Sequence, residues 1–370
     1  MKIHSLALGT LIMAACAGCE AAEHTLKETF RNHFLIGAAL NESQFTERNA
    51  AEAALIKKQF NSITPENVMK WRWIHPELDR FEFGPADRYV EFGEKNGMSV
   101  IGHALIWHEQ TPRWVFEDNN GDPATRETLL ARMSNHIHSV VGRYKGRVKG
   151  WDVVNEALNE DGSLRQTPWL KIIGEDYLVK AFEFAHAADP NAELYYNDFG
   201  NEDEPKRIGT IALLKKLNAA GAHITGVGIQ QHAKMGWPSP KLLEDTIIAF
   251  SQLGLRVMIT ELDVDLLPAA SRNRGADVSL RVGEDPKLNP YTNGLPDSVQ
   301  QALAKRYGEL FAVYVKHREH ISRVTFWGVT DGDSWLNNWP VRGRTSYPLL
   351  FDRLCQPKPA FDAVVRSAKP

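Results

Sequence analysis

The sequence predicts an α/β fold in which one (β/α)8 TIM barrel, spanning residues 23–370, forms a single domain. The first observation is an alternation, from His33 onward, of short β-rich runs and longer helical patterns, which makes eight units without a repeated motif. The second is the length of 370 residues, 43% of them hydrophobic, which suits one large domain with an extensive core. Closing eight such units into a barrel removes both edges of the parallel sheet.

An open doubly wound sheet is the alternative architecture. Its nucleotide-binding versions need a third glycine and a helix start that cradles phosphate, and neither follows Gly226 and Gly228. No change in composition marks a domain linker. The polar stretch 268–296 comes after the seventh predicted strand, so we expect it on the rim of the barrel, and no motif assigns a role to residues 271–292.

The first four strands are predicted where β-branched, aromatic and other apolar residues cluster, at residues 34–39, 60–64, 99–102 and 151–156. Pro65 ends the second strand, because proline has no N–H for a sheet ladder. Apolar residues at helical spacing predict the intervening helices at 47–58, 86–96 and 125–141.

The same reasoning places the last four strands at 193–196, 225–229, 256–260 and 323–328. Helices are predicted at 169–187, 205–219, 240–253 and, at the end of the chain, 359–367. Pro190 follows the first of these helices closely, as expected of a residue that cannot continue a helix.

Residues 1–22 are predicted to be an export signal with a short N-terminal segment. Lys2 precedes the apolar stretch 6–15, which is too short to span a membrane. Ala17-Gly18-Cys19 resembles the end of a bacterial lipoprotein signal, although Cys16 stands where leucine is usual, and cleavage by an ordinary signal peptidase is the rival interpretation. We favour a periplasmic or cell-surface lipoprotein over a freely secreted protein. Processing would leave Cys355 as the one cysteine of the folded body, so no internal disulfide is expected.

Composition argues against several classes of function. The net charge of -3, with Lys and Arg scattered along the chain, gives no basic footprint for nucleic acid or for an anionic membrane surface. The pair His136 and His138 does not share a helix face, and Asp331-Gly332-Asp333 is a lone acidic turn, so no metal is predicted. A neutral polymer or small molecule is the better candidate for a partner.

Polar residues follow several predicted strands, and in a parallel barrel such positions gather over one mouth. The fourth strand ends in Asn155 and Glu156, and the seventh stops at Glu261. Two carboxyl groups in one cleft are what hydrolysis of a glycosidic bond requires, since one protonates the leaving oxygen and the other faces an oxocarbenium-like centre. Taken singly, either glutamate could instead be solvated or ion-paired.

Two segments, 151–156 (WDVVNE) and 259–263 (ITELD), make the chain resemble the glycoside hydrolase family 10 endo-β-1,4-xylanases from about His33 to Phe361. Supporting segments are 64–71, 102–112, 230–232 and 326–335. The resemblance implies a barrel that cleaves β-1,4-xylan with retention through a covalent glycosyl-enzyme intermediate. It also implies xylan and xylo-oligosaccharides as partners, and we expect a monomer without cofactor.

The resemblance implies a role for each matching residue. Glu156 is similar to the family's acid/base and Glu261 to its nucleophile, so the charge on Glu261 should influence the pKa of Glu156. Asn155 matches the amide that binds the sugar 2-hydroxyl, and His232 matches the histidine beside the nucleophile, oriented by Asp263. The other matching cleft residues are Gln230, which contacts the acid/base; Glu66, Asn67, Lys70, His103 and Trp107 on the glycone side; Trp327 and Trp335 around the cleavage point; and Gln110, which with Trp335 would crowd out the hydroxymethyl group of glucose.

Some alternatives stay open. His103 and Lys70 could belong to a buried ion-pair network, and Trp107 and Trp327 could serve packing alone. A β-1,4-glucanase on the same type of barrel is the rival enzyme, and a surface protein that binds glycan on an inactive barrel is the rival outside enzymes.

Overall fold

The computed structural model describes residues 24–269 and 281–368. The predicted export signal therefore lies outside the described residues, as does part of the rim stretch. Within the described residues the strands are β1 (Leu35–Leu40), β2 (Ser62–Pro65), β3 (Ser99–Ile106), β4 (Gly150–Asn155), β5 (Glu193–Asp198), β6 (Gly226–Ile229), β7 (His232–Lys234), β8 (Arg256–Asp265) and β9 (Ile321–Phe326).

Eight of these strands form a closed parallel barrel, as the sequence predicts. Each pairs in parallel with its neighbour from β1 through β6; β6 then pairs with β8, and β9 joins β8 to β1. The short β7 was not predicted and extends the sheet locally beside β8, where His232 pairs with Asp263 in register. The ring has no open edge, which is the physical reason for closure.

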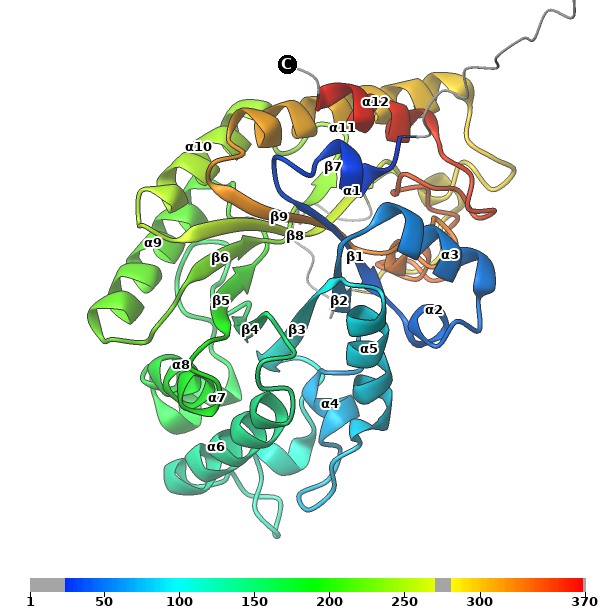
Figure 1. Cartoon of the computed structure of the whole chain (residues 1–370). Coiled ribbons are helices and arrows are strands. Elements are labelled where there is room, and N and C mark those ends of the chain that lie inside the picture. Colours follow the sequence, from blue (N-terminus) through cyan, green and yellow to red (C-terminus); the bar gives the residue numbers. More distant parts are fainter. Residues whose placement is uncertain (1–23, 270–280, 369–370) are drawn as a thin grey trace, which may run out of the picture.

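Helices surround the strands on all sides of the barrel (Figure 1). They are α1 (Leu26–Thr29), α2 (Glu42–Phe45), α3 (Ala50–Gln59), α4 (Trp71–Ile74), α5 (Phe83–Lys95), α6 (Arg126–Arg143), α7 (Pro168–Ile173), α8 (Tyr177–Ala188), α9 (Glu204–Ala219), α10 (Pro240–Ser251), α11 (Asp297–Lys316) and α12 (Pro359–Ser367). Short 3-10 turns lie at Arg113–Val115, Pro286–Leu288 and Trp335–Asn337.

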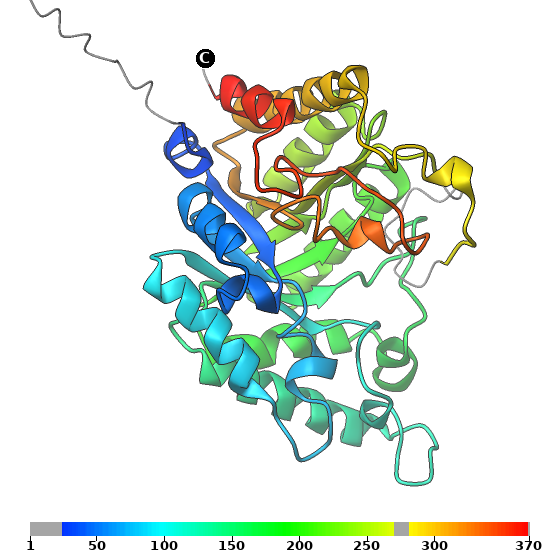
Figure 2. The same ribbon diagram turned by 90° about the vertical axis from the view of Figure 1, so that its right-hand side faces the viewer.

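Two helix predictions need correction. The helix predicted at 169–187 is two helices, because Gly174 ends α7 with a backbone φ of 93° that only glycine adopts readily. The longest helix, α11, was not predicted, although its buried residues Leu303, Tyr307, Leu310 and Tyr314 follow helical spacing. It packs against α12 and closes one side of the barrel (Figures 1 and 2).

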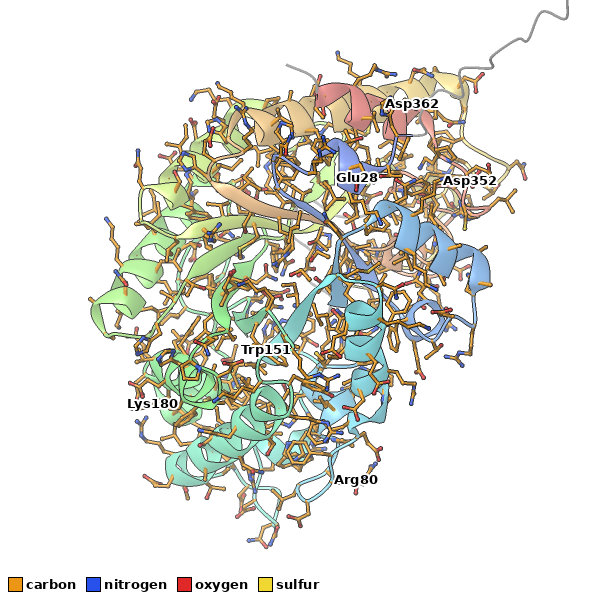
Figure 3. The ribbon with its side chains drawn as sticks, in the orientation of Figure 1. Glu28, Arg80, Trp151, Lys180, Asp352 and Asp362 are labelled. Atoms are coloured by element: carbon orange, nitrogen blue, oxygen red, sulfur yellow. The ribbon has the colours of Figure 1, made fainter. Side chains whose placement is uncertain are left out.

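The core lies between the barrel and its helices, and its largest side chains are aromatic. Trp151 of β4 is buried inside the ring of helices, whereas Arg80 and Lys180 lie at the periphery (Figure 3). A Cβ atom at Gly102 would lie 2.1 Å from the Trp151 ring, so glycine on β3 is needed for this tryptophan to pack. Among the described residues, no helix combines the length and the apolar character that a membrane span requires.

Candidate active site

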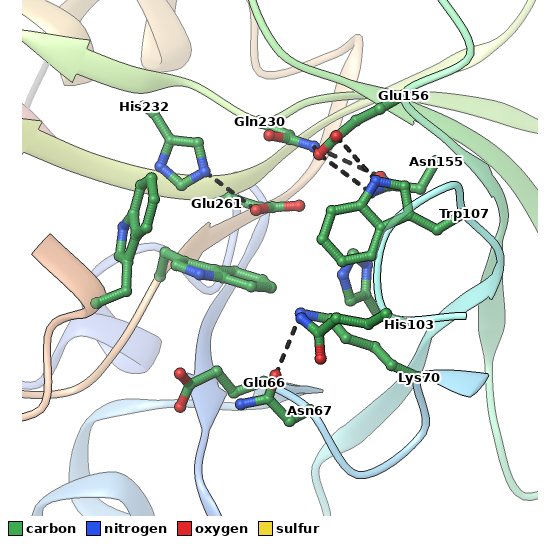
Figure 4. Close-up of a pocket in the computed structure, with 13 residues that line it drawn as sticks. Glu66, Asn67, Lys70, His103, Trp107, Asn155, Glu156, Gln230, His232 and Glu261 are labelled. Carbon is green, nitrogen blue, oxygen red and sulfur yellow. Dashed lines mark hydrogen bonds and ion pairs between the residues drawn. The ribbon is translucent and has the colours of Figure 1, made fainter. Parts of the chain in front are cut away.

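The thirteen predicted cleft residues line one pocket of about 200 Å³ (Figure 4). They come from β3, β4, β7, β8 and the segments that follow β2, β3, β4, β6 and β9, so residues far apart in sequence converge. The set is Glu66, Asn67, Lys70, His103, Trp107, Gln110, Asn155, Glu156, Gln230, His232, Glu261, Trp327 and Trp335. Asp263, predicted to support His232, does so at 3.1 Å between Oδ1 and the His232 Nδ1.

Glu156 is the first residue after β4, and the strand ends there because the backbone of Glu156 adopts the left-handed region, with a φ of 56°. Such a conformation costs a non-glycine residue of order 1 kcal/mol and is found mostly where the surroundings enforce it. The carboxyl accepts hydrogen bonds from Trp107 Nε1 and Gln230 Nε2, each at 2.9 Å, and from Asn155 Nδ2 at 3.2 Å.

The pKa of Glu156 is raised to about 7, first by burial and then by the charge of Asp198. The Gln230 hydrogen bond lowers it, and the charge of Glu261 raises it further. The expectation that Glu261 acts on this pKa therefore holds in direction, but the larger influence comes from Asp198 at the end of β5. Asp198 is itself fully buried and pairs with Lys206 at 2.7 Å.

The pKa of Glu261, in contrast, is lowered. Burial alone would raise its pKa, but the His232 hydrogen bond, nearby positive charge and the Asn197 amide outweigh burial and hold the pKa below its usual range. His232 Nε2 lies 3.1 Å from Glu261 Oε2. Burial lowers the pKa of His232, yet Asp263 and Glu261 together raise it to about 10, so the imidazole is positively charged at neutral pH.

Asn197 was not predicted as a site residue, although it stands at the end of the fifth predicted strand. Its Nδ2 donates to Asn155 Oδ1 at 2.9 Å and to Glu261 Oε1 at 2.8 Å, and its Oδ1 accepts from Thr260 Oγ1 at 2.7 Å. A Cβ atom at Gly228 would lie 2.3 Å from Asn197 Oδ1, so the glycine on β6 leaves room for this side chain. Asn197 thus joins the two carboxyl groups through a continuous chain of hydrogen bonds that passes through Asn155.

The predicted glycone side combines buried charges with aromatic rings. Lys70 Nζ lies 5.0 Å from the Trp107 ring centroid and 5.8 Å from that of Trp327, within reach of cation–π attraction. Burial lowers the pKa of Lys70 and raises that of Glu66. Lys70 Nζ also donates to Asn67 Oδ1 at 3.4 Å.

His103 is placed differently from the prediction, inside β3 rather than after it. Its Nδ1 lies 2.9 Å from Asp152 Oδ2, and the same residue lines the cleft. On the opposite wall Trp335 stacks on Trp339 at 4.5 Å and donates from Nε1 to Asp263 Oδ2 at 2.7 Å.

Gln110 is held at the cleft by its neighbours on α4. Its Oε1 accepts a hydrogen bond from Trp73 Nε1 at 3.1 Å, and its carbonyl oxygen accepts from Arg72 N at 2.9 Å. No group of three or more His, Cys, Asp or Glu side chains suited to a metal ion is found in the part of the chain that the structure describes. Of the two carboxyl groups in the site, Glu156 has a raised pKa and Glu261 a lowered one, a difference typical of paired carboxyls that divide acid and nucleophile roles.

The chain matches known proteins over most of its length. The model of glycosyl hydrolase family 10 matches residues 25–367. The chain is 44% identical over 365 residues to endo-1,4-beta-xylanase A of Xylanibacter ruminicola, covering 99% of each chain. It is also 44% identical over 344 residues to a beta-1,4-xylanase of Dictyoglomus thermophilum, covering 92% of this chain and 90% of the relative.

The fold also matches a solved structure, a GH10 endoxylanase from a sugarcane soil metagenome, with a TM-score of 0.90. The identity to that protein is 44%, with 92% of this chain and 99% of the other covered. A match across nearly the whole chain in sequence and in structure leaves one assignment: the chain belongs to glycosyl hydrolase family 10.

Proposed function

We propose that the protein is an endo-1,4-β-xylanase that cleaves xylan with retention, with Glu156 as acid/base and Glu261 as nucleophile. The observation that carries the proposal is the opposite bias of the two buried carboxyls, with the pKa of Glu156 raised to about 7 and that of Glu261 lowered. The names of the xylanases that the chain resembles support the choice of substrate.

In the first step, protonated Glu156 donates its proton to the leaving glycosidic oxygen while ionised Glu261 attacks the anomeric carbon. The C–O bond to the leaving sugar breaks and an ester between the sugar and Glu261 forms. Charged His232, 3.1 Å from Glu261 Oε2, keeps the nucleophile ionised before attack. General acid assistance of this kind typically contributes about 10²–10⁴ in rate.

In the second step, Glu156 acts as base toward water, which attacks the same carbon and releases Glu261. Esterification removes the charge on Glu261 and therefore one of the influences that raise the pKa of Glu156. Burial and Asp198 still raise the pKa of Glu156 at this stage, so Glu156 is basic enough to take the proton from water.

Asn155 supplies the hydrogen bond to the sugar 2-hydroxyl, which strengthens as the oxocarbenium ion develops. Asn197 holds Asn155 by its carbonyl oxygen, which directs the Asn155 amide nitrogen toward Glu156 and the substrate side. Trp327 and Trp335 supply the apolar faces on which the C–H edges of sugar rings pack.

The test is chemical rescue of Glu156→Ala and Glu261→Ala on an activated aryl β-xyloside with added azide. Glu156→Ala should yield the β-glycosyl azide, and Glu261→Ala should yield the inverted α-azide, both identified by NMR. Normal xylan hydrolysis by Glu156→Ala, or an α-azide from that variant, would show that the acid/base assignment is wrong. Product sizes from xylan, and turnover of xylan against cellulose chains, test internal cleavage and substrate class.

We also propose that the protein is exported, and that Cys19 carries the lipid of a bacterial lipoprotein. The support is the order of Lys2, the apolar stretch 6–15 and Ala17-Gly18-Cys19. Mass spectrometry of the mature protein tests both parts, because a diacylglyceryl cysteine at the N-terminus and an unmodified residue after ordinary cleavage differ in mass.

A further inference from the structure

A second polar cavity, here called the rim pocket, lies between the segment before α11 and the segment after the Trp335–Asn337 turn. Its volume of about 440 Å³ exceeds the 200 Å³ of the catalytic pocket and falls within the range typical of small-molecule sites, about 300–1,000 Å³. The polar side chains that line it are Glu284, Asp285, Asn289, Thr292, Arg342 and Arg344. None of these residues belongs to the site described above.

The rim pocket adjoins the catalytic cleft through the wall that carries Trp335. Trp335 stacks on Trp339, and the carbonyl oxygen of the next residue, Pro340, accepts a hydrogen bond from Val282 N at 3.0 Å. The yellow segment that follows residue 280 is therefore bonded to the segment around residue 340, and both lie on the right-hand side of Figure 2. A group that enters the pocket from a chain in the cleft would have to pass this tryptophan pair.

Strand β8 links the two sites from below. Asp263, which holds Trp335 and His232, and Asp265, which pairs with Arg344 at 3.3 Å, are two residues apart on one strand. Side chains at such positions point to the same face about 7 Å apart. The partner of Arg344 is thus two residues along β8 from the partner of His232.

Arg344 is the feature that points to a ligand. The residue is 3% exposed, and only its Nη2 has a partner, Asp265, whereas Nε and Nη1 are buried without any hydrogen-bond partner among the described residues. A buried donor left unpaired is destabilising, and more so when the group is charged. Arg344 also lines the pocket, so a hydroxyl-bearing ligand there would lie beside this buried charged group.

The lining favours a neutral ligand over an anion. The lining includes two carboxylates, Glu284 and Asp285, and two guanidinium groups, Arg342 and Arg344, and Asp265 pairs with Arg344 at 3.3 Å. Carboxylates accept from hydroxyls and guanidinium groups donate to them, so the set matches a molecule that both donates and accepts. Asn289 adds amide donors, since its Oδ1 is already occupied by Thr345 N at 2.9 Å.

We propose that the rim pocket binds a neutral pentose branch of the xylan chain whose backbone occupies the cleft. This assignment rests on the proposed function for the backbone substrate, and it makes branched xylan the preferred substrate class. Arg342 and Asn289 donate to the hydroxyls of the branch, Glu284 accepts from them, and Arg344 forms the floor.

The test compares three xylo-oligosaccharides of equal backbone length: one linear, one with a single arabinofuranosyl branch and one with a single glucuronic acid branch. The full chain is measured beside Arg342→Ala, Asn289→Asp and the control Arg318→Ala, an exposed arginine outside the pocket. Asn289→Asp keeps the oxygen that holds Thr345 N while removing the amide donors. Thermal unfolding verifies that each variant is folded.

The ratio of kcat/KM for the arabinose-branched over the linear substrate should fall about three- to tenfold in both pocket variants, as loss of one hydrogen bond implies, and stay constant in Arg318→Ala. The proposal is overturned if the ratio is unchanged in both pocket variants, or if only the glucuronic acid substrate responds. If the wild-type chain cleaves none of the three, the proposed function fails instead. Calorimetric binding to Glu261→Ala then decides for the pocket alone: tighter binding of the branched than of the linear compound supports it, and equal binding refutes it.

Discussion

Trp107 offers a direct test of how the protein sets the pKa of its acid/base. Its Nε1 donates to Glu156 Oε2 at 2.9 Å, and a donor to the ionised carboxylate lowers the pKa of the acid. Trp107→Phe keeps an aromatic ring but removes the N–H, so the pKa of Glu156 should rise. Hydrogen bonds to charged groups contribute about 1.5–3 kcal/mol, and one pKa unit corresponds to about 1.4 kcal/mol.

Trp107 contributes less to the pKa of Glu156 than burial, Asp198, Gln230 or Glu261, so the lower end of that range applies. The expected change is about one unit, from about 7 to about 8, seen as an alkaline shift of the basic limb of kcat/KM against pH. Because the acid must be protonated to donate, activity at pH 8 should fall less steeply in the variant than in the wild-type protein.

Trp327→Phe is the matched control. Its ring lies 5.8 Å from Lys70 Nζ in the same cleft, so both substitutions change the packing of substrate and can lower kcat. Only Trp107→Phe should move the basic limb. A limb that stays in place or moves to lower pH in Trp107→Phe, or an equal shift in both variants, would refute the electrostatic reasoning.

Three further predictions follow from named contacts. Burial raises the pKa of Glu202 to about 7, well above the 4.5 of an exposed glutamate, so the free energy of unfolding of the wild-type protein should decline as pH rises through this interval. In Glu202→Gln this decline should be smaller by up to about 3 kcal/mol, measured by denaturant unfolding at pH 4 and pH 8. Asn155→Ala should lower kcat/KM on a xyloside by about 10²-fold, mostly through kcat. On a 2-deoxyxyloside, which lacks the hydroxyl, the same substitution should lower kcat/KM very little. An equal loss on both substrates would contradict the 2-hydroxyl contact. His232→Asn removes the hydrogen bond that lowers the pKa of Glu261, so the acidic limb of kcat/KM should move to higher pH, and an unmoved limb would count against the pairing.

Sequence patterns reveal the barrel and its cleft because both follow from local chemistry. A β-rich run that changes abruptly to polar residues, as at Asn155, indicates a strand and a ligand-facing end together. The patterns place strand ends too early, however. β3 continues through His103 to Ile106 and β8 through Glu261 to Asp265, because a side chain that faces the barrel mouth can be polar while its backbone still pairs.

Long-range contacts could not be predicted in the same way. Asn197 looks like one more polar residue at a strand end, and its importance comes from bonds to residues 42 and 64 positions away. The influence of Asp198 on Glu156 likewise depends on burial that no local pattern gives. Helix α11, in contrast, has a legible apolar spacing and could have been recognised from its residues alone.

Two aspartates of β8, Asp263 and Asp265, contact different sites, and this separation determines which parts of the barrel can be exchanged. Asp263 pairs with the histidine beside the nucleophile, and Asp265 pairs with Arg344 in the rim pocket, so one strand supports both the catalytic site and the proposed branch site. The rim segments 281–292 and 340–347 hold one another through main-chain and side-chain bonds of their own. Exchanging both segments together for those of a related barrel, with Asp265 retained, should transfer tolerance for side branches while the turnover of linear chains is preserved.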